Sequence, residues 1–274
     1  MKKLEIPPKA KKSLGQNFLT DNLAIVSIIE AINPKTSDTI VEIGPGHGEL
    51  TLPLLKSGAK VIAIEKDSSL AEKLVSSLAE EIHKNQLEVI YGDALKLLPS
   101  LWAAKELNGA SRYRAYKLVG NIPYYITGFL LRSIAELEPK PSSIVLTIQK
   151  EVAERICAKP GNMSLLAASV QFWGKPEIIR IIPRESFSPA PKVDSAVIRI
   201  VPIISYKSSV ISQNFYSFIK VLFKQPRKTI LNNLRGLLNA EEIEKTGVDP
   251  NSRPQNLEME KIINLARTAH FYQK

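Results

Sequence analysis

The chain has 274 residues, 44% of them hydrophobic, which is enough for one large domain and a smaller one. A single cysteine, Cys157, excludes an internal disulfide framework, and three histidines give no zinc cluster, so we expect no metal site. No apolar stretch is long enough for a signal peptide or a membrane span, which favours a cytoplasmic protein. The formal net charge of +10 favours a polyanionic partner such as nucleic acid.

The first helix follows a basic segment. Residues 11–19 have the composition of a mobile tail, and Asp21 or Asn22 then caps a helix with four apolar residues on its predicted buried side, namely Leu23, Val26, Ile29 and Ile32.

Strand and helix patterns alternate through the next part of the chain. We expect strands over residues 40–43, 60–64, 87–91, 116–120, 143–148, 178–182 and 193–201. Helices are predicted over residues 68–83, 127–137, 151–158 and 164–173, and residues 99–115 are predicted as a helix with a loop. Such alternation predicts an α/β fold with a largely parallel sheet.

Beyond Pro202 the apolar residues recur only at helical spacing, as in Phe215, Phe218 and Leu222. We therefore expect a ligand-binding domain over residues 1–205 and a small all-α domain over residues 206–274. The second domain carries a basic surface, which is either an RNA contact or a solvated helix face, formed by Lys220, Lys224, Arg227, Lys228 and Arg235.

A glycine-rich turn follows the first of the predicted strands. Gly44, Gly46 and Gly48 lack Cβ atoms where the chain turns, so the backbone can lie against a ligand at the strand tip. Glu65 ends the next strand, about 20 residues further on, where an acidic residue reaches ribose hydroxyls. This predicts an adenosine-containing ligand, and the alternative is a turn that only connects strand to helix.

The residue after this turn indicates which adenosine ligand binds. Glu49 occupies the position of the last glycine in the dinucleotide fingerprint, and its charge at a helix N-terminus would repel a pyrophosphate. S-adenosylmethionine has a ribose but no phosphate, and we predict it as the cofactor. Asp93 stands at the tip of the third strand and is expected to contact the adenine, although aspartates in turns are common.

The segment after the fourth strand suits methyl transfer to an exocyclic amine. Such a nitrogen is a poor nucleophile until it pyramidalises. Its two N–H groups can donate hydrogen bonds to the Asn121 side-chain oxygen and the Ile122 carbonyl oxygen, which favours that change. Pro123 directs this carbonyl, and Tyr124 offers a face for an unstacked base. Phe187, in a Pro-rich loop, is the predicted second wall for the base. The alternatives are an ordinary turn and a loop that Phe187 merely anchors.

Several ordered motifs along nearly the whole chain resemble the small-subunit (16S) ribosomal RNA adenine N6-dimethyltransferase family. The motifs are Lys12-x-Leu14-Gly15-Gln16-Asn17-Phe18-Leu19, Glu42-Ile43-Gly44-Pro45-Gly46-x-Gly48, Gly92-Asp93-Ala94, Asn121-Ile122-Pro123-Tyr124, Phe187-x-Pro189-x-Pro191-x-Val193-x-Ser195, Arg227 to Leu234 and Arg253-Pro254-Gln255-x-Leu257. The resemblance implies a Rossmann-like class I S-adenosylmethionine-dependent methyltransferase with a small C-terminal all-α domain.

The resemblance also implies a substrate and a set of cofactor contacts. The substrate would be two adjacent adenosines in a hairpin loop near the 3′ end of small-subunit rRNA, dimethylated within an assembling subunit, and we expect the enzyme to act as a monomer. The segment around Asn17 then becomes a lid on the cofactor instead of a tail. The implied cofactor contacts are Asn17, Leu19, Gly44, Glu65, Asp93 and Asn121, with Gly46 added from the glycine turn.

Two positions depart from this family pattern, and two other functions compete with it. Tyr125 stands where the family usually has Asn, and Pro226 replaces the first of two usual arginines. One rival is the related large-subunit (23S) rRNA adenine N6-methyltransferase of the resistance type, against which the Arg253-Pro254 segment argues. The other is a non-catalytic assembly or transcription factor of the same fold, against which Glu65, Asp93 and Asn121 argue together.

Overall fold

The computed structural model describes residues 10–103, 116–203 and 209–271. The predicted domain boundary between residues 205 and 206, and most of the loop predicted within residues 99–115, lie outside the described residues. Within them, no helix is long and apolar enough to cross a membrane.

A seven-stranded sheet with the order β4-β3-β2-β5-β6-β9-β7 forms the centre of the fold. Neighbouring strands are parallel from β4 to β6, whereas β9 pairs antiparallel with both β6 and β7. The prediction of a largely parallel sheet is thus confirmed for five of its strands. The strands are β2 (Thr39–Ile43), β3 (Lys60–Glu65), β4 (Leu87–Tyr91), β5 (Tyr116–Asn121), β6 (Ser143–Gln149), β7 (Gly174–Ile182) and β9 (Ser195–Pro202).

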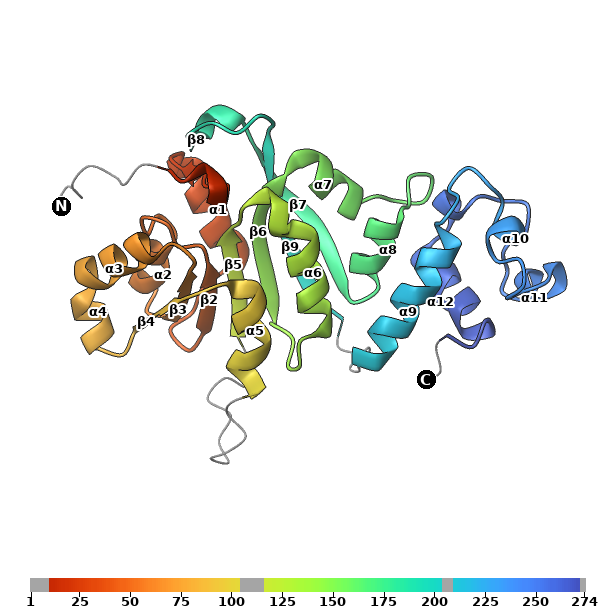
Figure 1. Cartoon of the computed structure of the whole chain (residues 1–274), viewed down its shortest axis with the longest axis horizontal. Helices are drawn as coiled ribbons and strands as arrows, with labels where there is room; N and C mark the ends of the chain where they lie inside the picture. Colours follow the sequence, from red (N-terminus) through yellow and green to blue (C-terminus); the bar gives the residue numbers. More distant parts are fainter. Residues whose placement is uncertain (1–9, 104–115, 204–208, 272–274) are drawn as a thin grey trace.

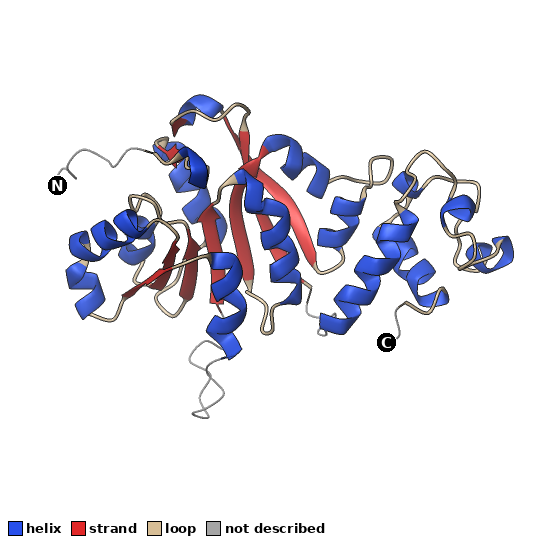
Figure 2. Ribbon diagram, viewed as in Figure 1, coloured by secondary structure: helices blue, strands red, loops and turns tan. Residues whose placement is uncertain are grey.

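Helices cover both faces of this sheet (Figures 1 and 2). Successive strand residues belong to different apolar clusters: Ile40 packs on one face and Val41 on the other. The cluster on the first face includes residues of α1 (Asn22–Ile32), α2 (Thr51–Lys56) and α3 (Ser68–Ser77). The cluster on the second face includes residues of α5 (Ala94–Ala103), α6 (Thr127–Glu136), α7 (Lys150–Ile156) and α8 (Leu165–Gln171). Burial on both faces explains the unbroken apolar runs of the central strands, such as residues 61–64 of β3 and 144–146 of β6.

The register of the parallel strands aligns their carboxyl ends. Ile43 lies opposite Ile64 on one side and Gly120 on the other, so Gly44, Glu65 and Asn121 follow at one level of the sheet. Strand order reverses between β2 and β5, which is the position where open α/β sheets bind ligands. The glycine at 120 is required here, because a Cβ atom would lie 2.6 Å from the Ile43 carbonyl oxygen.

The segment before α1 is packed against the protein, so the composition-based prediction of a mobile tail is wrong. A 3-10 turn, η1 (Lys12–Leu14), leads into β1 (Phe18–Leu19), which pairs antiparallel with β8 (Phe187–Ser188). Leu19 is buried in the cluster that also contains Phe187. Long-range pairing of this kind leaves no sign in local composition.

Two helix predictions also needed correction. Of the α1 residues predicted as buried, Ile32 is buried and Ile29 packs against the core, but Leu23 and Val26 are 64% and 50% exposed. Ala24 and Ile28 are buried as well. Helix α1 has apolar residues on several sides, so spacing alone did not identify the packed face. The single helix predicted over residues 68–83 is divided at Leu78 into α3 and α4 (Ala79–His83).

The described residues after β9 are helical, comprising α9 (Ser209–Leu222), α10 (Ile230–Asn233), α11 (Ala240–Glu244) and α12 (Met259–Thr268). They lie at the end of the molecule away from β4 (Figure 1). Phe215 of α9 stacks on Phe172, which follows α8, with ring centroids 3.8 Å apart. Apolar contacts therefore continue from the sheet layer into the C-terminal helices.

Candidate active site

One pocket at the carboxyl ends of β2, β3, β4 and β5 collects nearly all the predicted site residues. Its lining includes the cofactor candidates Asn17, Leu19, Gly44, Gly46, Glu65, Asp93 and Asn121, and the catalytic candidates Ile122, Pro123 and Tyr124. Glu65 and Asn121 therefore face the same cavity. Phe187 is absent from this lining.

Glu65 is fixed by the glycine turn. Its Oε2 accepts a hydrogen bond from the backbone N–H of Gly46 at 3.1 Å, and its Oε1 accepts one from Asp67 at 2.8 Å. Burial raises the pKa of this carboxyl group, and the hydrogen bonds from the backbone of Asp67 and Gly46 oppose that increase. Each carboxylate oxygen has a second lone pair, so Glu65 can still accept ribose hydroxyls.

Asp93 forms an ion pair that the sequence did not reveal. Lys66 Nζ lies 2.8 Å from Asp93 Oδ2, and the backbone N–H of Leu95 donates to Oδ1 at 3.0 Å. The hydrogen bond from Lys66 lowers the pKa of Asp93, which keeps this carboxylate ionised. Parallel pairing of β3 with β4 brings the two residues together, because Glu65 lies opposite Tyr91.

The charged residues of the pocket lining are mainly acidic. Four acidic side chains, from Glu42, Glu49, Glu65 and Asp93, accompany one lysine, Lys66. Burial raises the pKa of Glu49 and raises that of Glu42 to about 8, so Glu42 is protonated at neutral pH and the negative charge of the lining comes from the other three. This lining suits a ligand that carries positive charge and hydroxyl groups and opposes a pyrophosphate. The residues present thus fit S-adenosylmethionine, whose sulfonium and ammonium groups are cationic.

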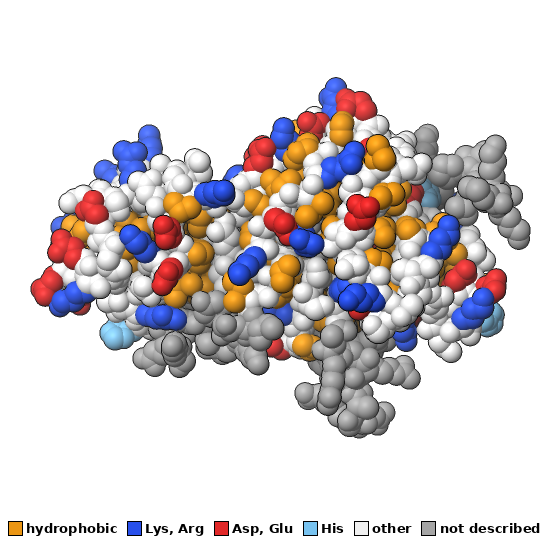
Figure 3. Space-filling model, turned by 180° about the vertical axis from the view of Figure 1, so that it is seen from behind, with side chains coloured by type: hydrophobic (Ala, Val, Ile, Leu, Met, Phe, Trp, Pro, Cys, Tyr) orange, Lys and Arg blue, Asp and Glu red, His pale blue; other side chains and the backbone are white. Residues whose placement is uncertain are grey.

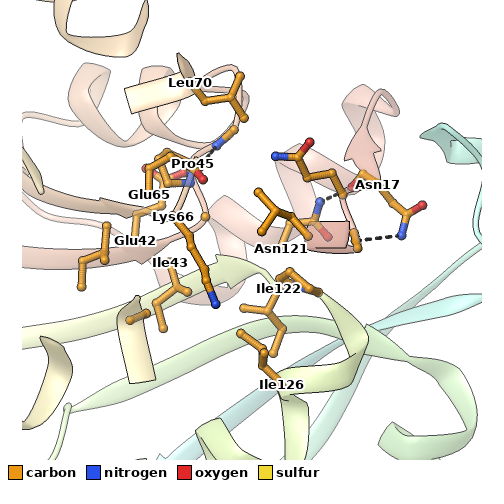
Figure 4. Close-up of a pocket in the computed structure, with 18 of the residues that line it drawn as sticks. Asn17, Glu42, Ile43, Pro45, Glu65, Lys66, Leu70, Asn121, Ile122 and Ile126 are labelled. Atoms are coloured by element: carbon orange, nitrogen blue, oxygen red, sulfur yellow. Dashed lines mark hydrogen bonds between the residues drawn. The ribbon is translucent and has the colours of Figure 1, made fainter. Parts of the chain in front are cut away.

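Asn121 is held in one orientation by the N-terminal segment. Its Nδ2 donates to the backbone carbonyl oxygen of Asn17 at 2.9 Å. Because a carbonyl oxygen only accepts, this contact assigns the nitrogen to the Asn17 side and leaves Oδ1 available as an acceptor. Figure 4 shows Asn17 and Asn121 side by side, with Glu65 and Lys66 across the pocket from them.

Tyr124 is positioned by a residue from another strand. Its hydroxyl group lies 2.6 Å from Ser195 Oγ, at the start of β9, and Ser195 is fully buried. Burial raises the pKa of the Tyr124 phenol, so it remains neutral at ordinary pH. The half-buried ring lines the pocket beside Pro123.

Phe187 does not form the second wall of the pocket in this structure. The side chain is 4% exposed and packs in an apolar cluster, and its backbone pairs with Leu19. Phe187 anchors the loop because the β1–β8 pairing turns it inward. Its position matches the alternative in which the Pro-rich loop carries an anchoring aromatic residue.

The segment over residues 10–19, called the lid from here on, is fastened to the start of α3. Lys11 Nζ lies 2.7 Å from Asp67 Oδ1, and Gln16 Nε2 donates to Asp67 Oδ2 at 3.0 Å. Although burial opposes the shift, hydrogen bonds from Lys11, Ser69 and Gln16 lower the pKa of Asp67 to about 2. Phe18 packs on the glycine turn, with its ring centroid 4.2 Å from that of His47.

Sequence reasoning missed Lys66, Asp67 and Ser195 as parts of the site. A signal for Lys66 and Asp67 was present, since they directly follow Glu65 at a strand tip where side chains converge. Ser195 lies within a quoted motif, but its contact with Tyr124 depends on the antiparallel pairing of β6 with β9.

The fold and the pocket at the reversal of strand order define a Rossmann-like class I methyltransferase. Solved structures with this fold include the following two. A dimethyladenosine transferase from Plasmodium falciparum matches with a TM-score of 0.73 and 27% identity, covering 90% of this chain and 95% of that one. The 23S rRNA methyltransferase ErmE matches with a TM-score of 0.72 and 24% identity, covering 93% of this chain and 100% of that one, which shows the fold alone.

The family model described as ribosomal RNA adenine dimethylase matches residues 8–270, and the chain belongs to this family. Curated relatives named ribosomal RNA small subunit methyltransferase A are 41% identical in Lactobacillus helveticus and 34% identical in Acinetobacter baylyi. Each alignment covers 94% of this chain, with 91% and 92% of the respective relative. The resemblance inferred from the motifs is thus confirmed, and the protein is an rRNA adenine dimethyltransferase.

Proposed function

We propose that the chain transfers methyl groups from S-adenosylmethionine to N6 of two adjacent adenosines in a 3′-terminal hairpin loop of small-subunit rRNA, giving N6,N6-dimethyladenosines during subunit assembly. Family membership and the names of the curated relatives support this proposal. The observation that carries the chemistry is the orientation of Asn121, whose oxygen is available while its nitrogen is bound to Asn17.

The residues at the end of β5 and directly after it prepare the target amine. Asn121 Oδ1 and the Ile122 carbonyl oxygen accept the two N6–H bonds, which favours a pyramidal nitrogen with a localised lone pair. These acceptors strengthen as positive charge develops on nitrogen, so they stabilise the transition state more than the bound substrate. The methylated amine then loses a proton to water. Tyr124, held by Ser195, stacks on the adenine, and Phe187 supports the loop beside it.

The same pocket holds the cofactor. Glu65 would accept hydrogen bonds from the ribose hydroxyls, and Asp93 would contact the adenine amine. The backbone at Gly44 and Gly46 would lie against the amino acid end of the cofactor. Asn17 and Leu19 cover the cofactor from the lid. S-adenosylmethionine supplies an electrophilic methyl group on a sulfonium centre.

The partner is the rRNA of an assembling small subunit, and we place the enzyme in the cytoplasm as a monomer. Residues 206–274 are proposed as the helical domain that contacts rRNA, through the basic side chains on α9 and the segment after it. The names of the relatives favour small-subunit rRNA over the large-subunit alternative, and the available Asn121 oxygen favours an enzyme over a non-catalytic factor.

The test is incubation of the full chain with labelled S-adenosylmethionine and small or large ribosomal subunits from a strain lacking this methylation, followed by nucleoside analysis. We expect labelled N6,N6-dimethyladenosine in small-subunit rRNA alone. Label confined to the large subunit would favour the resistance-type activity, and no label in either would refute methyl transfer.

A further inference from the structure

Two aromatic side chains are exposed on the outer side of the active-site pocket. Phe129 is 70% exposed, the highest fraction among the exposed large hydrophobic side chains in the described part of the chain, and Tyr125 is 54% exposed. Tyr125 belongs to η3 (Tyr124–Ile126) and Phe129 to the adjoining first turn of α6. Exposing two aromatic rings so close together costs solvation energy that burial against a partner would recover.

Both rings line a second cavity, which we call the cleft, between α6, α8 and α9. These helices contact one another and lie next to each other in Figure 1. Tyr125 lines both the cleft and the active-site pocket, so the two cavities meet at its ring. The ring lies next to Gly15 of the lid, at which an added Cβ atom would lie 3.2 Å from Tyr125 Cε1.

The charged side chains of the cleft are mostly basic. Arg132, Arg155 and Lys220 line it together with one acid, Glu136, which pairs with Arg132 at 3.7 Å. Tyr216 adds a partly exposed aromatic ring, with the Arg132 guanidinium carbon 4.9 Å and Lys220 Nζ 5.9 Å from its centroid. A basic channel with exposed aromatic rings matches the chemistry of single-stranded nucleic acid binding.

We propose that Tyr125 and Phe129 form a platform on which an unpaired base next to the target adenosine stacks, while the cations of the cleft bind the adjoining phosphates. The inference rests on the proposed function, because an adenosine that enters the pocket draws its neighbours past Tyr125. The charge of the cleft favours RNA over a protein segment. Gly128, which lies between the two aromatic residues in sequence, also lines the cleft, and no atom lies within 4 Å of its Cβ position.

The test measures the affinity of a fluorescently labelled RNA hairpin with two adjacent adenosines in its loop. Phe129→Ala and Phe129→Leu should each weaken binding by about ten-fold or more, because leucine keeps apolar area but has no π-face. Phe129→Trp should bind at least as tightly as the unmodified chain. Val75→Ala, at a 43% exposed apolar position on α3, is the matched control and should leave the affinity unchanged.

A second series removes the base instead of the ring. Hairpins with an abasic nucleotide at each position flanking the adenosines should include one that binds the unmodified chain about ten-fold more weakly, yet loses little further affinity with Phe129→Ala. Equal affinity of all Phe129 variants, or strictly additive losses at every position, would overturn the platform. So would a loss seen with intact small subunits but not with the hairpin, which would indicate a protein partner.

The platform and the proposed function fail in different ways. If the unmodified chain transfers no labelled methyl group to small subunits, the proposed function is wrong whatever the variants bind. If it does transfer methyl groups and Phe129→Ala binds the hairpin as the unmodified chain does, only the platform is wrong.

Discussion

The side-chain amide group of Asn121 connects the end of β5 to the lid. Its nitrogen donates a hydrogen bond to the backbone carbonyl oxygen of Asn17, so its oxygen points away from that carbonyl. A freely rotating amide would present the wrong atom part of the time, so we expect the bond to Asn17 to orient the proposed acceptor before substrate binds.

Replacing this side chain separates catalysis from cofactor binding. Asn121→Ala is expected to lower turnover by about 10²-fold or more, as when one preorganised transition-state partner is removed. Cofactor affinity should fall much less, because the other proposed cofactor contacts, at Glu65, Asp93 and the glycine turn, remain in place. Single-turnover methylation and titration calorimetry measure the two effects, with Asn162→Ala, at an exposed asparagine in a bend, as the control. Equal losses in both measurements would contradict this division.

Glu42 makes the stability of the fold depend on pH. Burial raises its pKa from 4.5 to about 8, while a hydrogen bond from Thr51 Oγ1 at 2.7 Å opposes the shift. Between these values the native state holds a proton that the unfolded chain has released. Stability is therefore lost as pH rises through this window, by no more than about 1.4 kcal/mol per pH unit.

Glu42→Gln keeps the acceptor for Thr51 and removes the titration. We expect the free energy of unfolding of this variant to exceed that of the unmodified chain by a margin that grows from pH 5 to pH 8. Urea unfolding at several pH values measures the margin. Glu80→Gln, at an exposed carboxylate, provides the control. Parallel curves for Glu42→Gln and the unmodified chain would show that Glu42 does not bind the extra proton.

Side-chain positions were predictable where a strand tip dictated them. Glu65, Asp93 and Asn121 each end or follow a strand, and parallel pairing brings such residues together without further information. Phe187 was placed wrongly because the direction of its ring depends on pairing with Leu19, some 170 residues away in sequence. Long-range antiparallel pairing between two-residue strands has no local pattern.

At the scale of elements, the junction between β2 and β5 depends on close backbone approach. Gly120→Ala would bring a Cβ atom within 2.6 Å of the Ile43 carbonyl oxygen and 3.1 Å of Ile122 Cγ2. We expect the free energy of unfolding to fall by about 1–3 kcal/mol, as for other overpacked interiors. Gly128→Ala in α6 is the matched control, because nothing lies within 4 Å of its Cβ position. Equal unfolding midpoints for the two variants would show that the junction tolerates the added carbon.

The lid shows what local patterns omit at this scale. Its residues have no apolar period, and what orders them is their partners: Asp67 binds Lys11 and Gln16, and β8 pairs with β1. The strands, by contrast, were predicted to within a few residues because each carries a short apolar segment, and in the central strands, such as β3 and β6, that segment is buried on both faces. Helix ends were predicted less well. The helix predicted over residues 68–83 is divided at Leu78, although the residues on both sides of it are helical.

At the scale of the whole molecule, the net charge of +10 does not produce a uniformly basic surface. Seen from the side opposite Figure 1, basic and acidic side chains are interspersed between hydrophobic ones (Figure 3). The pocket lining is acidic, whereas the charged residues of the cleft are mostly basic. If cofactor and RNA bind as proposed, they meet opposite fields in adjoining cavities, and we expect this to keep phosphates out of the cofactor site and guide them along the cleft.

This arrangement predicts how salt affects the two ligands. Hairpin affinity should fall steeply with salt, with a log–log slope set by the number of phosphates neutralised, because counterions are released on binding. Arg155→Gln should reduce the magnitude of the slope by about one unit, if that side chain binds one phosphate. Lys84→Gln should leave the slope unchanged, because Lys84 forms an exposed ion pair beside α4, at the end of the sheet away from the cleft (Figure 1). S-adenosylmethionine carries no phosphate, so its affinity should change little over the same range. A flat titration with RNA would show that the cations of the cleft do not bind the backbone.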